Sequence, residues 1–493
     1  MTTMTTMTTT TPLSRRAALE RSAVGFGWLA ATALFRELGG TGGGEGVARA
    51  EAVEPGGATP RAVGPAAPPH GIPARARRVI FLFMKGGPSH VDTFDHKPKL
   101  TADDGKELPF AKPRVQFAET GRLLGSPWRF TPRGQSGIPV SELFPHVARH
   151  VDDICFLHAL HGTNPAHGGA VLKLHTGSDT FVRPGMGAWV NYGLGTENAN
   201  LPGFITICPT LAHGGVNNWG AAFLPAEFQG VPLGVASKPS SEARVASIAN
   251  PRWSRGVQRT QLDLIRELAG EESAGRGADP LTEARLTSFE LAFRMQTEMP
   301  TVQDLSGETP ETLALYGLDD PVTENFGRQC LLARRFAEAG VRFIQVTHSD
   351  AKVQWDQHGD LLAGHTEKAA EVDRPIAGLL ADLKRRGLLE DTLVLWGGEF
   401  GRTPVMQGKD GRDHNPEGFT MWMAGGGVKG GFRYGSTDDY GYYAVENRMH
   451  VHDLHATLLH LLGIDHLRLT YRHAGRNFRL TDVAGSVHTG VLA

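Results

Sequence analysis

The sequence predicts an α/β protein whose core is a mostly parallel sheet flanked by helices. Residues 78–84 and 392–396 are short, nearly continuous apolar runs, a pattern typical of strands that are buried on both faces. Residues 341–346 also predict a strand, and a helical stretch at 366–386 separates it from the run at 392–396. A strand, a helix and a second strand in this order form a right-handed parallel crossover by default. These observations together favour a parallel sheet over a sandwich or a helical bundle.

The composition is that of a soluble globular protein. The chain has 493 residues, of which 40% are hydrophobic and 21% are charged, and its formal net charge is −2. A chain of this length exceeds the usual single domain, but large α/β enzymes can form one elaborated domain. Because a nucleic-acid binder would show a basic surface, we expect no nucleic-acid partner.

The first 76 residues predict an export signal and a linker. Arg15 and Arg16 precede a weakly apolar stretch at 22–35, and Ala48-Arg49-Ala50 has the small-x-small pattern of a cleavage site. Residues 1–50 therefore resemble a twin-arginine-type signal peptide, and the Pro-, Ala- and Gly-rich residues 51–76 predict a disordered linker. The apolar stretch, about 14 residues, is too short to span a bilayer comfortably, so a retained anchor is the weaker alternative. We expect the twin-arginine export machinery as a partner, a periplasmic or secreted location, and no stable membrane span after cleavage.

Residues 77–493 predict one folded α/β domain with a helical insertion. Residues 140–151 predict a helix, and residues 154–157 predict a second short strand. Helical periodicity at 257–269 and 281–298 predicts a helical insertion at about 250–325, whose charges are those of a solvated face.

Two glycine-rich loops that follow predicted strands carry candidate site residues. The first strand ends in Gly86-Gly87, followed by Asp92, a candidate metal ligand. The strand at 154–157 leads through Thr163 and His167 into a helix, whose free N–H groups would suit an oxyanion or a nucleophile. Thr163 is therefore a candidate nucleophile and His167 a candidate acid or metal ligand. The alternative is that Thr163 or Asn164 only caps the helix.

The densest cluster of carboxylate and imidazole side chains follows the two predicted strands at 341–346 and 392–396. Because ligands bind at the carboxyl ends of strands in open parallel sheets, we expect these side chains to meet at one edge. They would bind one or two divalent metals, and zinc or manganese suits the mixed nitrogen and oxygen donors better than calcium or magnesium. An ordinary polar loop is the alternative. The candidate ligands are Asp356, His358, His365, Glu399 and His414, and Arg402 is a candidate catalytic residue.

The motifs in combination resemble the domain-of-unknown-function 1501 family of exported bacterial proteins. The segments that carry the resemblance are GGPSHVDTFD from Gly86, NPAHGGAVLKLHTG from Asn164, WDQHGD from Trp355, WGGEFGRTP from Trp396, GRDHNPEGF from Gly411 and HVHDLHATLLHLLGID from His450. The resemblance covers nearly everything after Arg77 and implies an alkaline-phosphatase/sulfatase-like α/β fold. It also implies that Asp356 and His358 correspond to the first ligand pair of that superfamily and His414 to its later histidine.

Three departures from the superfamily pattern concern the site. Lys85-Gly86-Gly87 stands where the superfamily has an aspartate after its first strand, and Glu399 takes the place of an Asp-His pair. Residues 163–167 replace the Cys or Ser nucleophile motif of sulfatases. The resemblance implies hydrolysis of sulfate or phosphate esters on small molecules or polysaccharides. The alternative is a non-catalytic metal- or glycan-binding envelope protein of the same fold.

Overall fold

The computed structural model describes residues 71–111, 121–277, 279–349 and 354–493. The predicted signal peptide and most of the predicted linker lie outside these residues. The last residues of that linker are described: the backbone N–H groups of Arg75 and Ala76 both donate to the carbonyl oxygen of Leu461. No helix of the described ranges is long and apolar enough to cross a membrane.

The chain divides into two compact units, which are described separately. The larger unit comprises Arg61–Ala246 and Thr297–Ala493, and the smaller one includes Ser247–Gln296. All of the candidate site residues belong to the larger unit.

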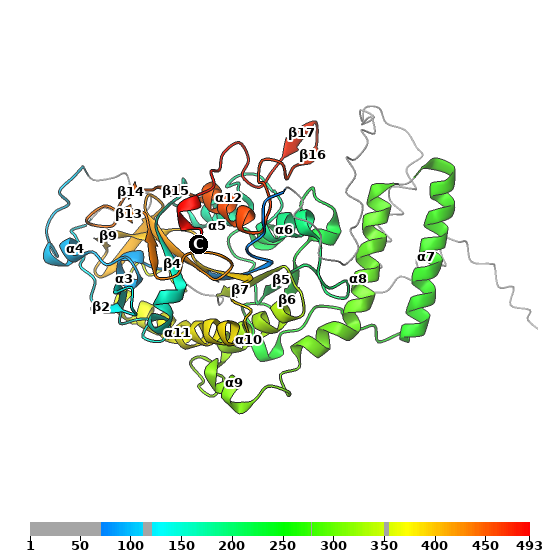
Figure 1. Ribbon diagram of the computed structural model, residues 1–493, viewed down its shortest axis with the longest axis horizontal. Helices are drawn as coiled ribbons and strands as arrows, with labels where there is room; N and C mark the ends of the chain where they lie inside the picture. Colours follow the sequence, from blue (N-terminus) through cyan, green and yellow to red (C-terminus); the bar gives the residue numbers. More distant parts are fainter. Residues whose placement is uncertain (1–70, 112–120, 278, 350–353) are drawn as a thin grey trace, which may run out of the picture. The chain divides into compact units, whose positions relative to one another are not determined.

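The larger unit is built on a mixed, mostly parallel sheet, which confirms the predicted fold class (Figure 1). Its strand β11 (Phe419–Ala424) is antiparallel to both of its neighbours, while all the other pairings are parallel. In spatial order the strands are β12 (Phe432–Tyr434), β4 (Ile154–His161), β11, β8 (Thr392–Gly397), β1 (Arg78–Met84), β7 (Phe343–His348), β5 (Phe204–Ile207) and β6 (Val231–Leu233). The short strand β15 (Met449–His450) also pairs with β4.

Strand β1 lies at the centre of the sheet, and all seven of its residues are buried. It pairs in parallel with β7 on one side and with β8 on the other. A strand covered on both faces must be apolar throughout, which is why residues 78–84 show no alternation of polar and apolar side chains.

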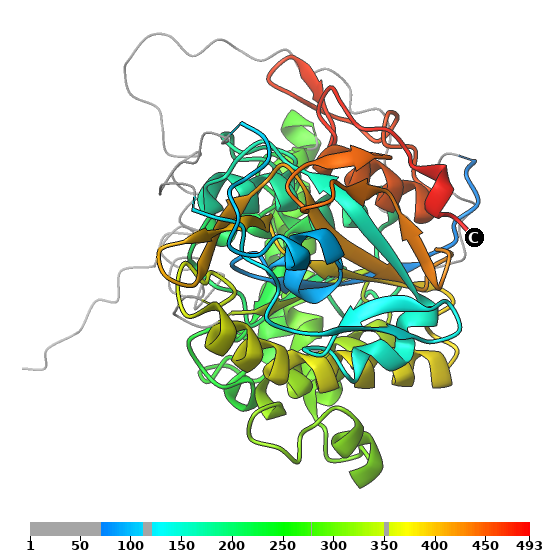
Figure 2. The same ribbon diagram turned by 90° about the vertical axis from the view of Figure 1, so that its left-hand side faces the viewer.

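Helices cover both faces of the sheet. Helices α5 (His167–Thr176), α6 (Met186–Leu194) and α12 (Val451–Leu461) lie on one side, and α10 (Glu324–Glu338) and α11 (Leu361–Arg385) on the other, as Figures 1 and 2 show. Phe83, Leu174, Trp189 and Leu458 belong to one core cluster between the sheet and the first group of helices. Each such side chain contributes about 1.5–3 kcal/mol by leaving water.

The histidines of α12 have a structural role at the end of α5. Nε2 of His452 donates to the carbonyl oxygen of Gly177, and Nε2 of His455 donates to that of Leu174, both at 2.8 Å. The last carbonyl groups of a helix lack partners within it, so these bonds satisfy the end of α5.

The helix predicted at 140–151 is wrong. Residues Ile138–Ser141 form strand β3, which pairs with β2 (Phe130–Arg133), and Val147–Asp153 form a 3-10 helix. Pro145 lies in the middle of the predicted helix, and proline there removes a hydrogen bond and clashes with the preceding turn.

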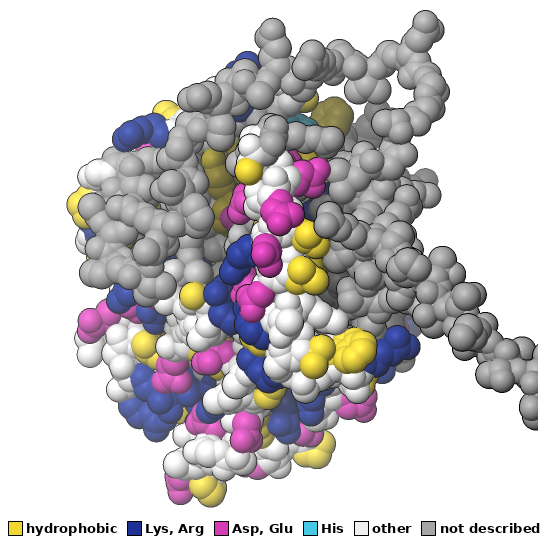
Figure 3. All heavy atoms as spheres, turned by 90° about the vertical axis from the view of Figure 1, so that its right-hand side faces the viewer, with side chains coloured by type: hydrophobic (Ala, Val, Ile, Leu, Met, Phe, Trp, Pro, Cys, Tyr) yellow, Lys and Arg dark blue, Asp and Glu magenta, His cyan; other side chains and the backbone are white. Residues whose placement is uncertain are grey.

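The predicted insertion at about 250–325 contains helices α7 (Arg255–Arg276), α8 (Pro280–Gln303) and α9 (Pro310–Leu315). Within the smaller unit, Arg259 of α7 forms an ion pair with Glu290 of α8, with Nη1 and Oε2 2.8 Å apart. The side of the molecule that carries α7 shows acidic and basic side chains interspersed (Figure 3). This mixture is that of a solvated surface.

Candidate metal centre

The candidate site lies at the carboxyl ends of the parallel strands. Asp356 and His358 follow β7, Glu399 follows β8, and His167 begins α5 after β4. Between β8 and β11 the chain makes an antiparallel hairpin of β9 (Gly401–Gln407) and β10 (Gly411–Asn415), which was not predicted and which carries His414. Because β11 runs opposite to β8, the hairpin must leave and re-enter the sheet at this same edge.

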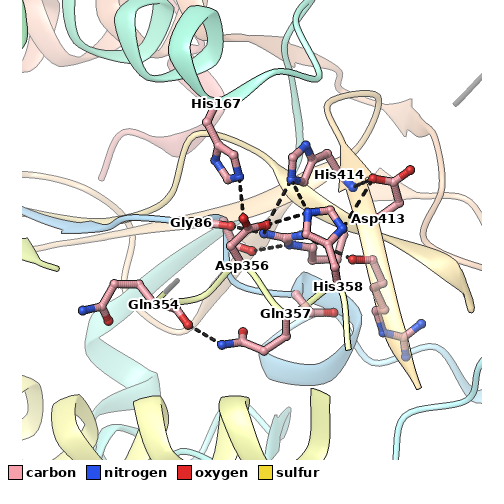
Figure 4. A network of polar contacts seen from close by, with 12 residues as sticks. Gly86, His167, Gln354, Asp356, Gln357, His358, Asp413 and His414 are labelled. Carbon is pink, nitrogen blue, oxygen red and sulfur yellow. Dashed lines mark hydrogen bonds and ion pairs between the residues drawn. The ribbon is translucent and has the colours of Figure 1, made fainter. Parts of the chain in front are cut away.

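Four residues converge there: His167, Asp356, His358 and His414 (Figure 4). One ligand atom from each of the four lies within 4.8 Å of all the others. Nε2 of His358 is 2.9 Å and Nε2 of His414 is 3.0 Å from Oδ1 of Asp356. Nε2 of His167 is 3.0 Å from Oδ2 of the same carboxylate.

The opposite nitrogen of each imidazole faces an acceptor. Nδ1 of His167 donates to Glu399 at 2.7 Å, and Nδ1 of His414 donates to the carbonyl oxygen of Pro165 at 2.7 Å. Nδ1 of His358 contacts the side-chain oxygen of Gln407. A proton held on Nδ1 leaves the lone pair of a neutral imidazole on Nε2, and metal-binding histidines are oriented in the same way. The three rings are therefore set to present Nε2 lone pairs to one point.

This donor set fits a divalent ion. The Nε2 atoms of His358 and His414 are only 3.0 Å apart. The buried Nε2 of His167 makes no hydrogen bond of good geometry, although it lies beside Asp356. Three imidazole nitrogens and one carboxylate oxygen form a set that zinc binds, and manganese accepts carboxylate oxygen readily. The site stays partly open, since the side chains of His358 and Asp356 are 35% and 23% exposed.

The charges of the centre are strongly coupled. Burial raises the pKa of Asp356, but the contacts with the imidazoles of His167, His358 and His414 and the charge of Arg402 outweigh it and hold that pKa well below its usual range. Burial opposes the charged form of His167, but Asp356 and Glu399 together raise its pKa. The hydrogen bond to Asp356 raises the pKa of His358, whereas burial lowers that of His414. A carboxylate kept ionised at all ordinary pH values is a suitable ligand for a cation.

Glu399 lies behind His167, outside the group of four. Its buried carboxylate accepts hydrogen bonds from Nδ1 of His167 and from the backbone N–H of Gly86, at 2.7 and 3.0 Å. Gly86 has φ +106°, and a Cβ atom there would lie 2.9 Å from the backbone nitrogen of Asp356. Glycine is therefore required for this close approach of two loops.

Arg402 is completely buried, and its guanidinium holds Asp356. Its Nη2 lies 2.6 Å from Oδ1 of Asp356, and its other N–H groups donate to the carbonyl oxygens of Gly86, Gly87 and Arg412. These bonds orient the carboxylate and tie the loop after β1 to the hairpin. The geometry thus gives Arg402 a positioning role.

The structure does not bring Asp92 or His365 into the group. Asp92 forms a two-bonded ion pair with Arg412, at 2.7 and 3.0 Å, and both side chains are fully buried. Nε2 of His365 accepts the backbone N–H of Ser89 at 3.0 Å, and burial lowers its pKa to about 3. Both residues fix the scaffold around the centre.

Thr163 is exposed, on the partly buried loop before α5. Asn164 makes the local turn instead, since its Oδ1 accepts the backbone N–H of Ala166 at 2.9 Å. The same loop supplies the Pro165 carbonyl group that holds His414.

Sequence reasoning missed His213, whose ring stacks on that of His167 at 4.8 Å with an angle of 6°. It lies on the loop after β5 and has φ +54°, a conformation that is rare for a residue other than glycine. The available signal was its place after a buried strand and before Gly214-Gly215, like the other glycine-rich loops of the site.

A mostly parallel sheet with a His/Asp cluster at its carboxyl edge is an α/β fold of the kind that the sequence predicted. The family model described as "Protein of unknown function (DUF1501)" matches residues 76–492. The chain therefore belongs to the DUF1501 family.

Three of the similar solved structures are a sulfatase, a lipoteichoic acid synthase and a protein in the alkaline phosphatase superfamily. The PsFucS1 sulfatase from Pseudoalteromonas sp. is 13% identical, with a TM-score of 0.33 over 79% of this chain and 68% of that one. The lipoteichoic acid synthase LtaP from Listeria monocytogenes is 10% identical, with a TM-score of 0.32 over 83% and 75%. A protein in the alkaline phosphatase superfamily from Vibrio parahaemolyticus is 9% identical, with a TM-score of 0.33 over 79% and 67%. These low scores carry no argument about chemistry, and no curated protein matched the chain.

Proposed function

We propose that this protein is a metal-dependent hydrolase of phosphate or sulfate esters. The observation that carries the proposal is the convergence of three imidazole Nε2 atoms and the Asp356 carboxylate, with each Nδ1 facing an acceptor. Zinc or manganese is the proposed cofactor. The proposed ligands are His167, Asp356, His358 and His414.

A divalent ion held there would polarise an ester oxygen and lower the pKa of a nearby water molecule. The protein's own groups do the rest. Glu399 and the Pro165 carbonyl group keep His167 and His414 in the tautomer that presents Nε2. Arg402 holds Asp356 in place, and Phe400 packs against the His414 ring at 4.4 Å and shields it from water.

The attacking group is either the Thr163 hydroxyl or a water molecule. Thr163 is the proposed nucleophile because its hydroxyl lies four residues before His167, on a loop that leads into the positive end of α5. A water molecule is the other candidate.

An ester panel on metal-loaded protein tests the proposal. We expect 4-nitrophenyl phosphate or 4-nitrophenyl sulfate to be hydrolysed by the wild type and not by His414→Ala. Full metal occupancy with no turnover of phosphate, sulfate or sulfated-polysaccharide esters would contradict hydrolysis and favour a metal- or glycan-binding protein.

We also propose export by the twin-arginine route, which rests on the sequence around Arg15 and Arg16. Cleavage after Ala50 is expected, and replacing both arginines with lysine should abolish export. Exported protein that still begins at Met1 would contradict this.

A further inference from the structure

Among the residues that the structure describes, Lys85 is a buried cation without a counter-ion. Its side chain follows β1 directly and the residue is only 6% exposed. Within the described part of the chain no hydrogen bond or ion pair reaches its ammonium group, and only its backbone carbonyl group is engaged, by the N–H of Trp355. An unpaired buried charge is strongly destabilising, so proteins rarely keep one without a function.

The side chain of Lys85 lies on the face of the sheet that α5 covers. Side chains alternate along a strand, and the Phe81 and Phe83 rings of β1 contact the ring of His175 in α5, at 5.6 and 4.6 Å. Lys85 continues that alternation at the site end of the strand. This end of β1 is close to the start of α5, because the Glu399 carboxylate accepts both the backbone N–H of Gly86 and the Nδ1 proton of His167.

The first turn of α5 adds unpaired donors to the same place. No side chain caps this helix, and its first internal hydrogen bond runs from Ala170 N–H to the Ala166 carbonyl group. The N–H groups of His167, Gly168 and Gly169 therefore point beyond the start of the helix. A Cβ atom at Gly168 would meet nothing within 4 Å, whereas one at Gly169 would meet the Asn164 side chain, so this turn is open beside Gly168.

We propose that Lys85 binds the tetrahedral oxyanion of the ligand, a phosphate or sulfate group, against the free N–H groups at the start of α5. That the bound anion is part of a substrate rests on the proposed function, whereas the binding of the anion itself does not. A helix start favours anions through its dipole and its donors, and an ammonium group beside it supplies the full charge. The adjacent His167 places the bound anion next to the proposed metal.

The test is a titration of purified full-length protein with inorganic phosphate and, separately, with inorganic sulfate, followed by calorimetry. Each titration is done after loading with Zn²⁺ and again with EDTA. The variants are Lys85→Met, which removes the charge, and Lys85→Arg, which keeps it. The matched control is Lys97→Met, because Lys97 is also mostly buried but pairs with Asp95 at 3.1 Å.

We expect Lys85→Met to raise the Kd of the preferred anion about ten- to hundredfold, because this is the typical effect of losing one charge-assisted hydrogen bond. Lys85→Arg should stay near the wild type. Without anion, Lys85→Met should keep or raise the melting temperature, whereas Lys97→Met should lower it and leave anion binding unchanged.

Three outcomes would overturn the inference: a wild type that binds neither anion, a Lys85→Met variant with the wild-type Kd, or a Lys85→Met melting temperature as low as that of Lys97→Met. A different outcome would contradict the proposed hydrolase function and leave this inference intact. Lys85-dependent anion binding in a protein that takes up no metal would contradict the hydrolase proposal and support the anion site.

Discussion

The Glu399 carboxylate accepts the Nδ1 proton of His167 at 2.7 Å across 232 positions of sequence. Glu399 is completely buried, and although burial raises its pKa, the bond from His167 and the N–H of Gly86 keep that pKa below its usual value. The pair therefore links the loop after β8 to the start of α5. It fixes which nitrogen of His167 faces the centre.

The first prediction concerns this pair. Glu399→Gln should weaken metal affinity about ten- to hundredfold, because partners behind a ligating histidine set its orientation and basicity. Competition with a chelator measures the affinity. The control is Glu371→Gln, since Glu371 pairs with His348 at 2.8 Å outside the centre. Equal affinities of Glu399→Gln and the wild type would contradict the role given to Glu399.

A second prediction concerns the buried pair of Asp92 and Arg412. Arg412→Met leaves the buried Asp92 carboxylate without its counter-ion, although the Ser89 hydroxyl still donates to it, so it should cost about 3–5 kcal/mol of unfolding free energy. Urea unfolding measures this cost. The control, Arg259→Met, breaks the half-exposed pair with Glu290 and should cost about 0–1 kcal/mol. Similar costs for the two variants would show that the buried pair is not special.

A third prediction concerns acid. Burial lowers the pKa of His158 and of His175 to about 4 and that of His455 to about 3, below the ordinary value of 6.5. Between these values the unfolded chain binds protons that the folded chain excludes, so stability falls as the pH drops below 6.5. Each group contributes about 1.4 kcal/mol per pH unit in that window.

Urea unfolding at pH 7, 6 and 5 tests this slope. His455→Gln cannot titrate, so its stability should fall less steeply than that of the wild type by the contribution of one group. Parallel pH curves for the two proteins would contradict the assignment.

The sequence predicted much of the fold because the strands are apolar throughout. The runs at 78–84 and 392–396 correspond to β1 and β8, and the alternation of strands and helices led to a parallel sheet. The order of the strands places Asp356, His358 and His414 at one edge. Proximity at that edge therefore follows from the topology of the sheet alone.

What the sequence could not give are contacts between distant loops. The partners of the three Nδ1 atoms are a carboxylate, an amide and a backbone carbonyl group, and no spacing encodes such pairs. Asp92 follows a buried strand, as the proposed metal ligands do, yet it pairs with Arg412, which lies 320 positions away in the sequence. His213 depends on a left-handed backbone that no local pattern indicated.

A fourth prediction concerns Thr163. If its hydroxyl attacks the ester, Thr163→Ala should abolish hydrolysis and leave bound metal unchanged, while Thr163→Ser should retain part of the activity. Turnover of 4-nitrophenyl esters and elemental analysis measure the two quantities. Full activity of Thr163→Ala would assign the attack to water.

The central claim is that His167, Asp356, His358 and His414 bind one divalent ion. The most direct measurement is elemental analysis of protein dialysed against zinc or manganese, for the wild type, His358→Ala, His414→Ala and the control His460→Ala on α12. We predict about one ion per chain in the wild type and the control, little in the two site variants, and a metal-dependent rise in melting temperature only where the ion binds. A wild type that retains no ion, or site variants that retain as much as the wild type, would contradict the account.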